Sequence, residues 1–257
     1  MRVVFVGAGR LATQLAQALH ENGHTVEAVY SRTKVSAEAL TAKVGGVATD
    51  KIDELPTAAD AFIIAVKDSA LSEVTRRLQE GREGQPMYHT SGSMPMSVFG
   101  SEGCHGVIYP MQTFSKERRV DFSRVPFFIE GNGEQSLQVA RRVASAVSSD
   151  VRELSSEQRR QLHLAAVFAC NFSNHCYALS AEVLERHGLT FDTMLPLIEE
   201  TAAKVHTLHP REAQTGPAVR YDENVINAHL QMLADDPRLQ QVYELMSKSI
   251  HETYSND

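Results

Sequence analysis

Residues 1–33, MRVVFVGAGRLATQLAQALHENGHTVEAVYSRT, decide the fold of this chain. Arg2 to Val6 is a short apolar stretch rich in β-branched side chains, which is typical of a buried strand. Gly7-Ala8-Gly9-Arg10-Leu11-Ala12 follows at once, and leucines then recur every four residues, as in a helix. Thr25 to Tyr30 is predicted to be a second strand. The order strand, glycine turn, helix, strand is the one that a dinucleotide-binding domain requires.

The glycine turn predicts a phosphate-binding site. Gly7 lets the chain leave the strand in a tight turn, and Gly9 lets a pyrophosphate approach the backbone. The free N–H groups and the dipole of the following helix favour the same anion. The alternative is a purely structural turn. We predict that a dinucleotide contacts the turn through Gly7, Ala8, Gly9, Arg10 and Leu11.

The end of the second strand bears on the choice of cofactor. Sites for NAD usually carry an acidic residue there, whereas an arginine accommodates the 2′-phosphate of NADP. This chain has Ser31-Arg32-Thr33, in which the arginine can pair with a phosphate and the hydroxyls can donate to it. We therefore predict NADP(H), with Ser31, Arg32 and Thr33 as contacts. The alternative is that Arg32 is a solvated loop residue.

Composition narrows the class of protein. The chain has 257 residues, 42% of them hydrophobic and 22% charged, as in ordinary globular proteins. Its net charge of −7 argues against nucleic acid or an anionic membrane as a partner. Three cysteines without a paired pattern favour the cytoplasm. Apolar runs stay well below the ~18 residues of a membrane helix, and the first is too short for a signal peptide.

Two further strands lead to the predicted edge of the site. Ala61 to Val66 is a continuous apolar run, typical of a central parallel strand, and Pro86 to Thr90 is the next strand. Ligands of such sheets bind at the carboxyl ends of the strands. We therefore expect Val66, Lys67 and Thr90 to contact the cofactor. Ser91, just after the second of these strands, is a candidate catalytic residue.

The pattern changes after the last predicted strand, Val151 to Leu154. Ser155 and Gln158 have the spacing of a capping box, and helical periodicity then continues to about His187, with Gly188 as a stop. We predict an α/β fold: an NADP-binding domain with a Rossmann-type parallel sheet, residues 1–154, followed by an all-α domain, residues 155–257.

The chain resembles Rossmann-like proteins that carry a C-terminal domain of unknown function 2520, many of which are named NADP oxidoreductases. The resemblance rests on Val6–Ala12, His89–Gly92, Tyr109–Phe114, Ala169–Phe172 and Thr215–Asp222. More distantly, the chain resembles pyrroline-5-carboxylate reductases, β-hydroxyacid dehydrogenases and deazaflavin-dependent NADP reductases. The resemblance implies NADP(H), a small-molecule substrate, and a homodimer formed through the helical domain.

The resemblance also implies that the usual proton donor is missing. β-Hydroxyacid dehydrogenases carry a lysine four residues before an asparagine on the long helix. Here Asn171 matches the asparagine, but Val167 stands where the lysine would be. His163 lies eight residues before Asn171, roughly on the same helical face, and an imidazole can donate or accept a proton near neutral pH. His163 and Asn171 are therefore candidate catalytic residues, with ordinary packed or exposed roles as the alternative.

The predicted function is hydride transfer between NADP(H) and a small carbonyl, hydroxy-acid or imine compound. Because the usual lysine is missing, the alternative is a non-catalytic NADP(H)-binding sensor or regulatory protein. An imine reductase that takes its proton from water is a third hypothesis. The Cys and His spacings match no metal-binding motif, so we expect no metal.

Overall fold

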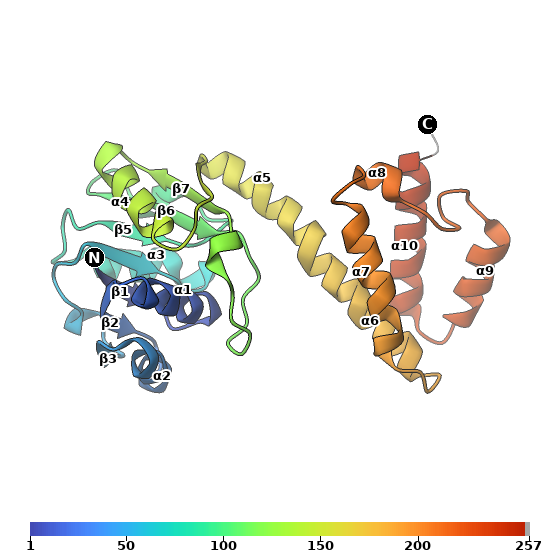
Figure 1. Cartoon of the computed structure of the whole chain (residues 1–257), viewed down its shortest axis with the longest axis horizontal. Helices are drawn as coiled ribbons and strands as arrows, with labels where there is room; N and C mark the ends of the chain where they lie inside the picture. The colour runs from blue at the N-terminus through green and yellow to red at the C-terminus, as the bar shows by residue number, and fades with distance from the viewer. Residues whose placement is uncertain (255–257) are drawn as a thin grey trace. The chain divides into compact units, whose positions relative to one another are not determined.

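The computed structural model describes residues 1–254, and the chain divides into two compact units, Met1–Asn171 and Phe172–Asp257 (Figure 1). Strands give way to helices where the sequence predicts, because β8 (Val151–Glu153) is followed by α5 (Ser156–Ala166). The compact units nevertheless divide after Asn171 rather than at Leu154, since α5 packs on the sheet unit through its own side chains.

The first unit is built on one eight-stranded sheet, with the order β3-β2-β1-β4-β5-β6-β7-β8. The strands other than β8 are β1 (Arg2–Val6), β2 (Thr25–Tyr30), β3 (Val47–Thr49), β4 (Ala61–Ile64), β5 (Met87–His89), β6 (His105–Pro110) and β7 (Phe127–Gly131). The order reverses beside β1, which is where open α/β sheets bind dinucleotides.

The sheet is not parallel throughout. Strands β1 to β6 run parallel, but β7 pairs antiparallel with β6, and β8 is parallel to β7. Parallel neighbours need a crossover, usually a helix, whereas the link between β6 and β7 contains only the 3₁₀ turn Phe122–Arg124 and returns the chain directly. The prediction of a Rossmann-type parallel sheet is confirmed, and the structure adds that β7 and β8 run in the direction opposite to β1 to β6.

Helices cover both faces of the sheet. Helices α1 (Arg10–Glu21), α2 (Lys34–Val44) and α4 (Glu134–Ser145) share one apolar cluster with Phe5 and Ile63. Helix α3 (Asp68–Gln79) and the 3₁₀ turn Met96–Phe99 share another with strand residues of the opposite parity. Burial on both faces explains why the central strands are continuous apolar runs.

A continuous helical run begins with α5, passes through a π-helical turn, Val167–Phe172, and continues as α6 (Ser173–Glu185). The capping box is confirmed: the N–H of Gln158 donates to Ser155 Oγ at 3.2 Å, and the N–H of Ser155 donates to Gln158 Oε1 at 3.0 Å. The run ends just before Gly188, whose φ is +69°. The π-helical turn was not predicted.

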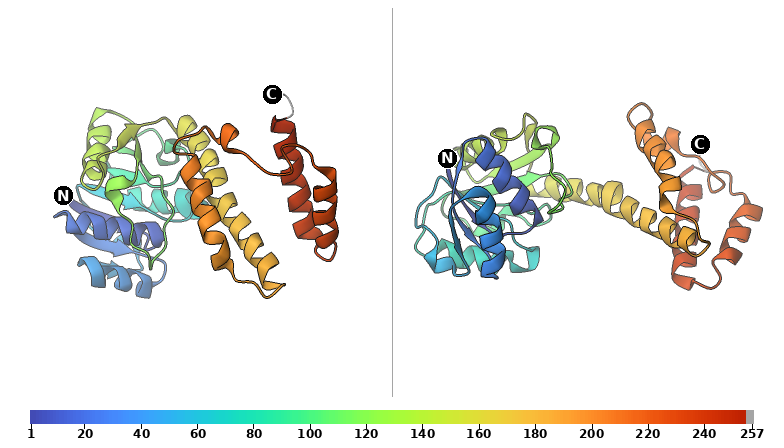
Figure 2. Two further views of the ribbon diagram at one scale, coloured as in Figure 1. Left: turned by 45° about the vertical axis from the view of Figure 1, so that its right-hand side comes forward. Right: turned by 60° about the horizontal axis from the view of Figure 1, so that its bottom comes forward.

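The regular elements of the second unit, as far as Tyr254, are helices (Figure 2). After α6 come the 3₁₀ turn Phe191–Met194, α7 (Leu195–Lys204), α8 (Pro210–Ala213), α9 (Glu223–Met232) and α10 (Pro237–Tyr254). Asp222 caps α9 by accepting from Val225 N at 3.4 Å. Arg238 donates to Glu182 at 2.6 Å and so ties α10 to α6.

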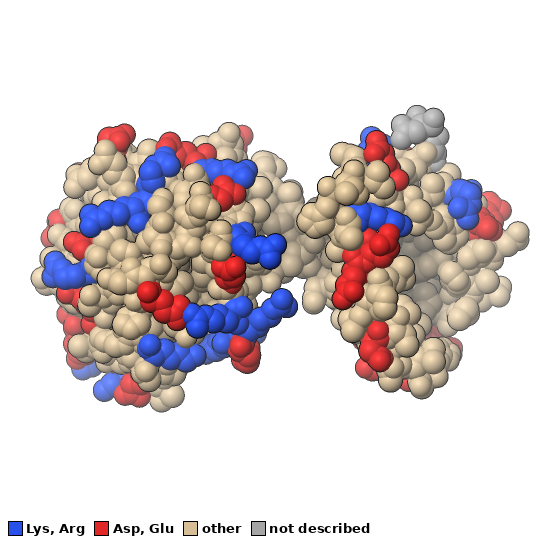
Figure 3. Space-filling model, viewed as in Figure 1, with Lys and Arg blue, Asp and Glu red and all other residues tan. Residues whose placement is uncertain are grey.

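Two surface properties bear on possible partners. On the face drawn in Figure 3, acidic and basic side chains are interspersed over the sheet unit. Within residues 1–254, the helices all fall short of the length and apolar character that a membrane-spanning helix needs.

Candidate functional site

A pocket of about 280 Å³ lies at the carboxyl ends of β1, β2 and β4. The predicted cofactor contacts that line it are Gly7, Ala8, Gly9, Ser31, Arg32, Thr33, Val66 and Lys67. The parallel strands bring these residues together because their carboxyl ends meet at one edge of the sheet, so turns that are distant in the sequence become neighbours.

The two glycines of the turn have different structural roles. Gly7 has φ +120°, and a Cβ on it would lie 2.3 Å from Ala65 O, so only glycine fits. A Cβ on Gly9 would meet no atom of residues 1–254 within 4 Å, its chain neighbours aside. Gly9 is also the N-cap of α1 and has no side chain to occupy the helix terminus. Open space beside a helix N-terminus is what a pyrophosphate requires.

The far end of the pocket gathers side chains that can donate to a phosphate. Arg32 is exposed there, and Thr33 Oγ1 donates to Ser36 Oγ at 2.8 Å. Ser36, which lies in the first turn of α2, was not predicted, although its three-residue spacing from Thr33 could have indicated it. Tyr30, and Ser69 at the start of α3, also line the pocket and were not predicted.

Three predicted cofactor residues fall outside the described lining of this pocket. Arg10 and Leu11 lie in the first turn of α1. Thr90 is buried, and its N–H and hydroxyl both donate to Ile64 O, at 3.1 and 3.4 Å. The backbone of Thr90 thus continues the β4–β5 pairing beyond the strands.

Ser91 shapes the turn that follows β5. Its Oγ accepts from the backbone N–H groups of Ser93 and Met94, at 3.2 and 3.0 Å. Ser93 Oγ in turn donates to Asp68, in the first turn of α3. The Ser91 side chain therefore organises the loop, and Asp68 holds that loop rather than capping α3.

His163 reaches the end of this loop. Its Nδ1 is 3.2 Å from Tyr109 Oη, and the two rings meet edge to face with centroids 6.0 Å apart. A Cβ on Gly92 would lie 2.6 Å from His163 Nδ1 and 2.9 Å from Tyr109 Cζ. His163 is thus brought against the loop that contains Ser91, another predicted catalytic residue. Tyr109 was not predicted as a site residue.

A buried ion pair fixes the start of α5 beside that loop. Arg159, 1% exposed, pairs with Glu130 on β7 and donates to Met94 O at 2.6 Å. Glu130 also accepts from the N–H and the hydroxyl of Ser156, at 2.9 and 2.7 Å. The pair connects the sheet, the loop after β5 and α5, and so holds His163 in position one helical turn further on.

His89 lies beneath the loop as a buried, neutral imidazole. Burial, with a further contribution from Arg159, lowers the pKa of His89 to about 4, against the opposing effects of the Pro95 carbonyl and Asp68. Its Nδ1 accepts from Ser91 N at 3.2 Å, and its ring stacks on Phe99. His89 therefore supports the loop as an uncharged acceptor at neutral pH.

Asn171 lies further along the helical run, in the π-helical turn, and is exposed. Eight residues separate it from His163, about 12 Å at ~1.5 Å per residue. The structure therefore does not bring the two candidates to the same point of the sheet edge. π-Helical turns occur often at functional sites, which keeps Asn171 of interest.

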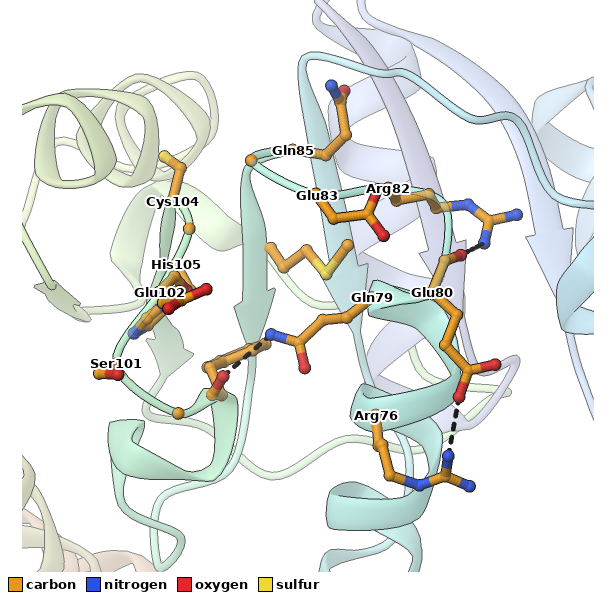
Figure 4. Close-up of a pocket in the computed structure, with 15 residues that line it drawn as sticks. Arg76, Gln79, Glu80, Arg82, Glu83, Gln85, Ser101, Glu102, Cys104 and His105 are labelled. Carbon is orange, nitrogen blue, oxygen red and sulfur yellow. Dashed lines mark hydrogen bonds and ion pairs between the residues drawn. The ribbon is translucent and has the colours of Figure 1, made fainter.

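A separate pocket of about 550 Å³ lies at the opposite edge, against the starts of β5 and β6 (Figure 4). Its polar side chains contact one another or the backbone: Arg76 pairs with Glu80 at 2.7 Å, and Gln79 donates to Phe99 O at 2.9 Å. Arg82 donates to backbone carbonyls, Leu55 O among them at 2.7 Å. These side chains therefore stabilise the fold.

Within residues 1–254, groups of three or more His, Cys, Asp or Glu side chains able to hold a metal ion are absent.

Comparison with known proteins identifies the family. Residues 1–110 match the Rossmann-like domain, and residues 125–250 match the domain of unknown function 2520. The crystal structure of a Bacteroides fragilis protein, provisionally named an NADP oxidoreductase, is 52% identical, with 98% of both chains covered and a TM-score of 0.94. A comparison with curated proteins finds no match.

More distant structures share the fold. A Thermotoga maritima protein is 23% identical over 98% of this chain and 99% of that chain, with a TM-score of 0.81. An imine reductase of Streptomyces aurantiacus is 16% identical over 98% of this chain and 94% of that chain, with a TM-score of 0.67. The identity and full-length coverage of the Bacteroides fragilis protein show that this chain belongs to the family of Rossmann-like proteins with a C-terminal domain of unknown function 2520.

Proposed function

We propose that this protein is an NADP(H)-dependent oxidoreductase that transfers a hydride to or from a small carbonyl, hydroxy-acid or imine compound. One observation carries the proposal: a single pocket joins the open turn at Gly9 to Arg32 at the end of β2. The provisional name of the Bacteroides fragilis relative and the imine reductase fold of a distant one support it.

The proposed cofactor contacts follow from the pocket. The pyrophosphate would contact the backbone of Gly7, Ala8 and Gly9 at the N-terminus of α1. The 2′-phosphate would be bound by Arg32, with hydroxyl donors from Thr33 and Ser36. Arg10 and Leu11, in the first turn of α1, would add backbone N–H groups. Bound in this way, NADPH would supply a hydride to the substrate.

The nicotinamide half would extend away from β2, past Val66 and Lys67, toward Thr90 and the loop that begins at Ser91. This direction is supported by the strand order, because β4 and β5 follow β1 on the side opposite β2. A small-molecule substrate would then lie by Ser91, Gly92 and His163. Asn171, further along the helical run, would contact only a part of the substrate that lies away from His163.

The first experiment is calorimetric titration with NADPH and NADH, in parallel, of the wild type and of Arg32→Ala. We expect wild-type NADPH binding to be stronger than NADH binding. Loss of a charge-assisted contact of about 1.5–3 kcal/mol would weaken NADPH binding by roughly 10- to 100-fold and leave NADH binding nearly unchanged. Arg142→Ala, at an exposed position on α4, is the control.

Equal weakening of both cofactors by Arg32→Ala would contradict the 2′-phosphate assignment. Absence of binding of either cofactor to the wild type would contradict the proposed function itself.

The alternative is a non-catalytic NADP(H) sensor, and Val167 in place of the dehydrogenase lysine favours it. An assay of NADPH oxidation with aldehydes, ketones, hydroxy-acid precursors and cyclic imines distinguishes the oxidoreductase from the sensor. Turnover of any one of these compounds supports the oxidoreductase. Tight NADPH binding without turnover of the whole set supports the sensor.

We also propose that the protein is a homodimer through its helical unit. That unit buries few large apolar side chains, among them Leu179, Ile226 and Leu239, and a small core stabilises a unit poorly. Exposed large apolar side chains of the unit include Leu189, Leu195, Leu197, Val205, Leu208, Met232, Leu245 and Met246. Burial of these side chains by a second copy would supply the missing core, and light scattering would then give twice the 28.4 kDa of one chain. A monomer would contradict this proposal.

A further inference from the structure

The loop after β5 and the end of β6 enclose a pair of side chains that can exchange a proton. Tyr109 lies near the carboxyl end of β6, the neighbour of β5, and its ring is beside the backbone of Gly92. His163 approaches from α5, with Nδ1 3.2 Å from Tyr109 Oη. Both groups lie at the sheet edge to which the nicotinamide half of the cofactor is directed under the proposed function.

We propose that Tyr109 Oη is the proton donor for the proposed hydride transfer, and that His163 Nδ1 returns a proton to it. This role rests on the proposed function. The substrate carbon accepts the hydride that bound NADPH supplies, and the substrate oxygen or nitrogen accepts the proton of Tyr109 Oη. The bond from that proton to Oη breaks, and Oη takes up the proton carried on His163 Nδ1. The histidine is left neutral, and water restores its proton.

The surroundings of the pair suit this chemistry. Burial raises the pKa of Tyr109, so its phenol keeps its proton through the neutral range. Arg159, on the same helix as His163, favours loss of that proton electrostatically, but its charge is shared with Glu130 on β7. Asp68 on α3 is engaged by Ser93, on the loop that borders the pair. The His163 imidazole, whose ring nitrogens can donate or accept a hydrogen bond, is therefore next to a phenol that stays protonated.

A second Tyr–His pair provides a matched control. In the helical unit, Tyr243 Oη is 2.8 Å from His229 Nδ1, and the rings meet edge to face with centroids 5.5 Å apart. Tyr243→Phe removes the same kind of hydrogen bond as Tyr109→Phe. A general loss of stability caused by removing such a bond would therefore appear in both variants.

The kinetic test uses the first compound of the screen that the wild type reduces. We expect Tyr109→Phe to lower kcat by roughly 10²- to 10⁴-fold, with NADPH affinity unchanged. His163→Asn should lower kcat less than Tyr109→Phe does, because it removes the group that returns the proton but leaves the phenol in place. Tyr243→Phe should keep the wild-type rate. An unchanged kcat in Tyr109→Phe overturns the role of Tyr109 and leaves the proposed function intact.

The spectroscopic test needs no substrate. In protein labelled with ¹⁵N-histidine, His163→Asn identifies the His163 signals, and NADP⁺ is the probe. We expect Tyr109→Phe to shift the ring ¹⁵N signals of His163 but not those of His229, and NADP⁺ to shift the His163 signals. Unchanged His163 ring signals in Tyr109→Phe overturn the proton exchange. Failure of NADPH to bind overturns the proposed function, and this role with it.

Discussion

Gly92 and His163 are in such close contact that a single added methyl group would collide with the ring: a Cβ on Gly92 would lie 2.6 Å from His163 Nδ1. The neighbouring Tyr109 ring blocks a second direction, since the same Cβ would be 2.9 Å from its Cζ. Glycine at this position therefore lets α5 approach the end of β5.

Gly92→Ala should displace His163 and break its contact with Tyr109. We expect a loss of about 1–3 kcal/mol in the free energy of unfolding, as for other overpacked sites. NADPH binding should persist, because Gly92 lies outside the pocket around Gly9. Urea unfolding measures the loss of stability, and the NMR signals of His163 report its displacement. Gly133→Ala is the control, since a Cβ there meets no described atom within 4 Å. Unchanged His163 signals in Gly92→Ala would contradict the close contact.

Gly7 and Gly9, two residues apart, should respond in opposite ways to alanine. Gly7→Ala introduces a Cβ 2.3 Å from Ala65 O at φ +120°, so we expect strong destabilisation, above about 1 kcal/mol, in thermal or urea unfolding. Gly9→Ala should keep the stability near that of the wild type, because its φ is −76° and its Cβ has room. That room is the proposed pyrophosphate site, so calorimetry should show weakened NADPH binding. Equal NADPH affinity in Gly9→Ala and wild type would exclude this use of the turn.

The elements set by local sequence could be predicted. The strand that ends at Val6, the glycine turn and the capping box at Ser155 depend on neighbours within a few residues, and the structure has all three. The antiparallel placement of β7 could not be predicted, because it depends on how a linker without a helix folds back. The π-helical turn at Val167–Phe172 interrupts an otherwise helical pattern that gives no sign of it.

The candidate site likewise has residues that could be predicted from local sequence and residues that depend on tertiary packing. Most cofactor contacts follow strands directly and could be predicted, whereas Ser36 lies in a helix and is indicated only by its three-residue spacing from Thr33. The pair Tyr109 and His163 is separated by 54 residues and meets only because α5 packs against β6. His163 could be named as a candidate from its position on the helix, but its partner depends on tertiary packing.

The ion pair of Arg159 and Glu130 should be essential to the sheet unit. Glu130→Gln leaves the Arg159 cation, 1% exposed, without its counter-ion, and breaking such a buried pair costs about 3–5 kcal/mol. The double variant Glu130→Gln/Arg159→Met should recover part of that loss, because it also removes the buried charge. Urea unfolding measures both. Arg76→Met, in an exposed pair with Glu80, should cost less than about 1 kcal/mol. A comparably small cost for Glu130→Gln would show that the pair is dispensable.

His89 should make the stability of the sheet unit depend on pH. Its pKa is lowered from 6.5 to about 4 in the folded protein, so between these values the unfolded chain binds more protons. The stabilising contribution is therefore complete above the unfolded value and is lost as pH falls toward the folded one. Between pH 7.5 and pH 5 the loss from this group is about 2 kcal/mol. Urea unfolding at the two pH values gives the free energy of unfolding at each. Between pH 7.5 and pH 5 this free energy should fall by about 2 kcal/mol less in His89→Asn than in the wild type. His20→Asn, at an exposed position, should keep the wild-type dependence. The same pH dependence in His89→Asn and wild type would mean that His89 can take up a proton without disturbing the fold, and that the loop at Ser91 does not rely on a neutral imidazole.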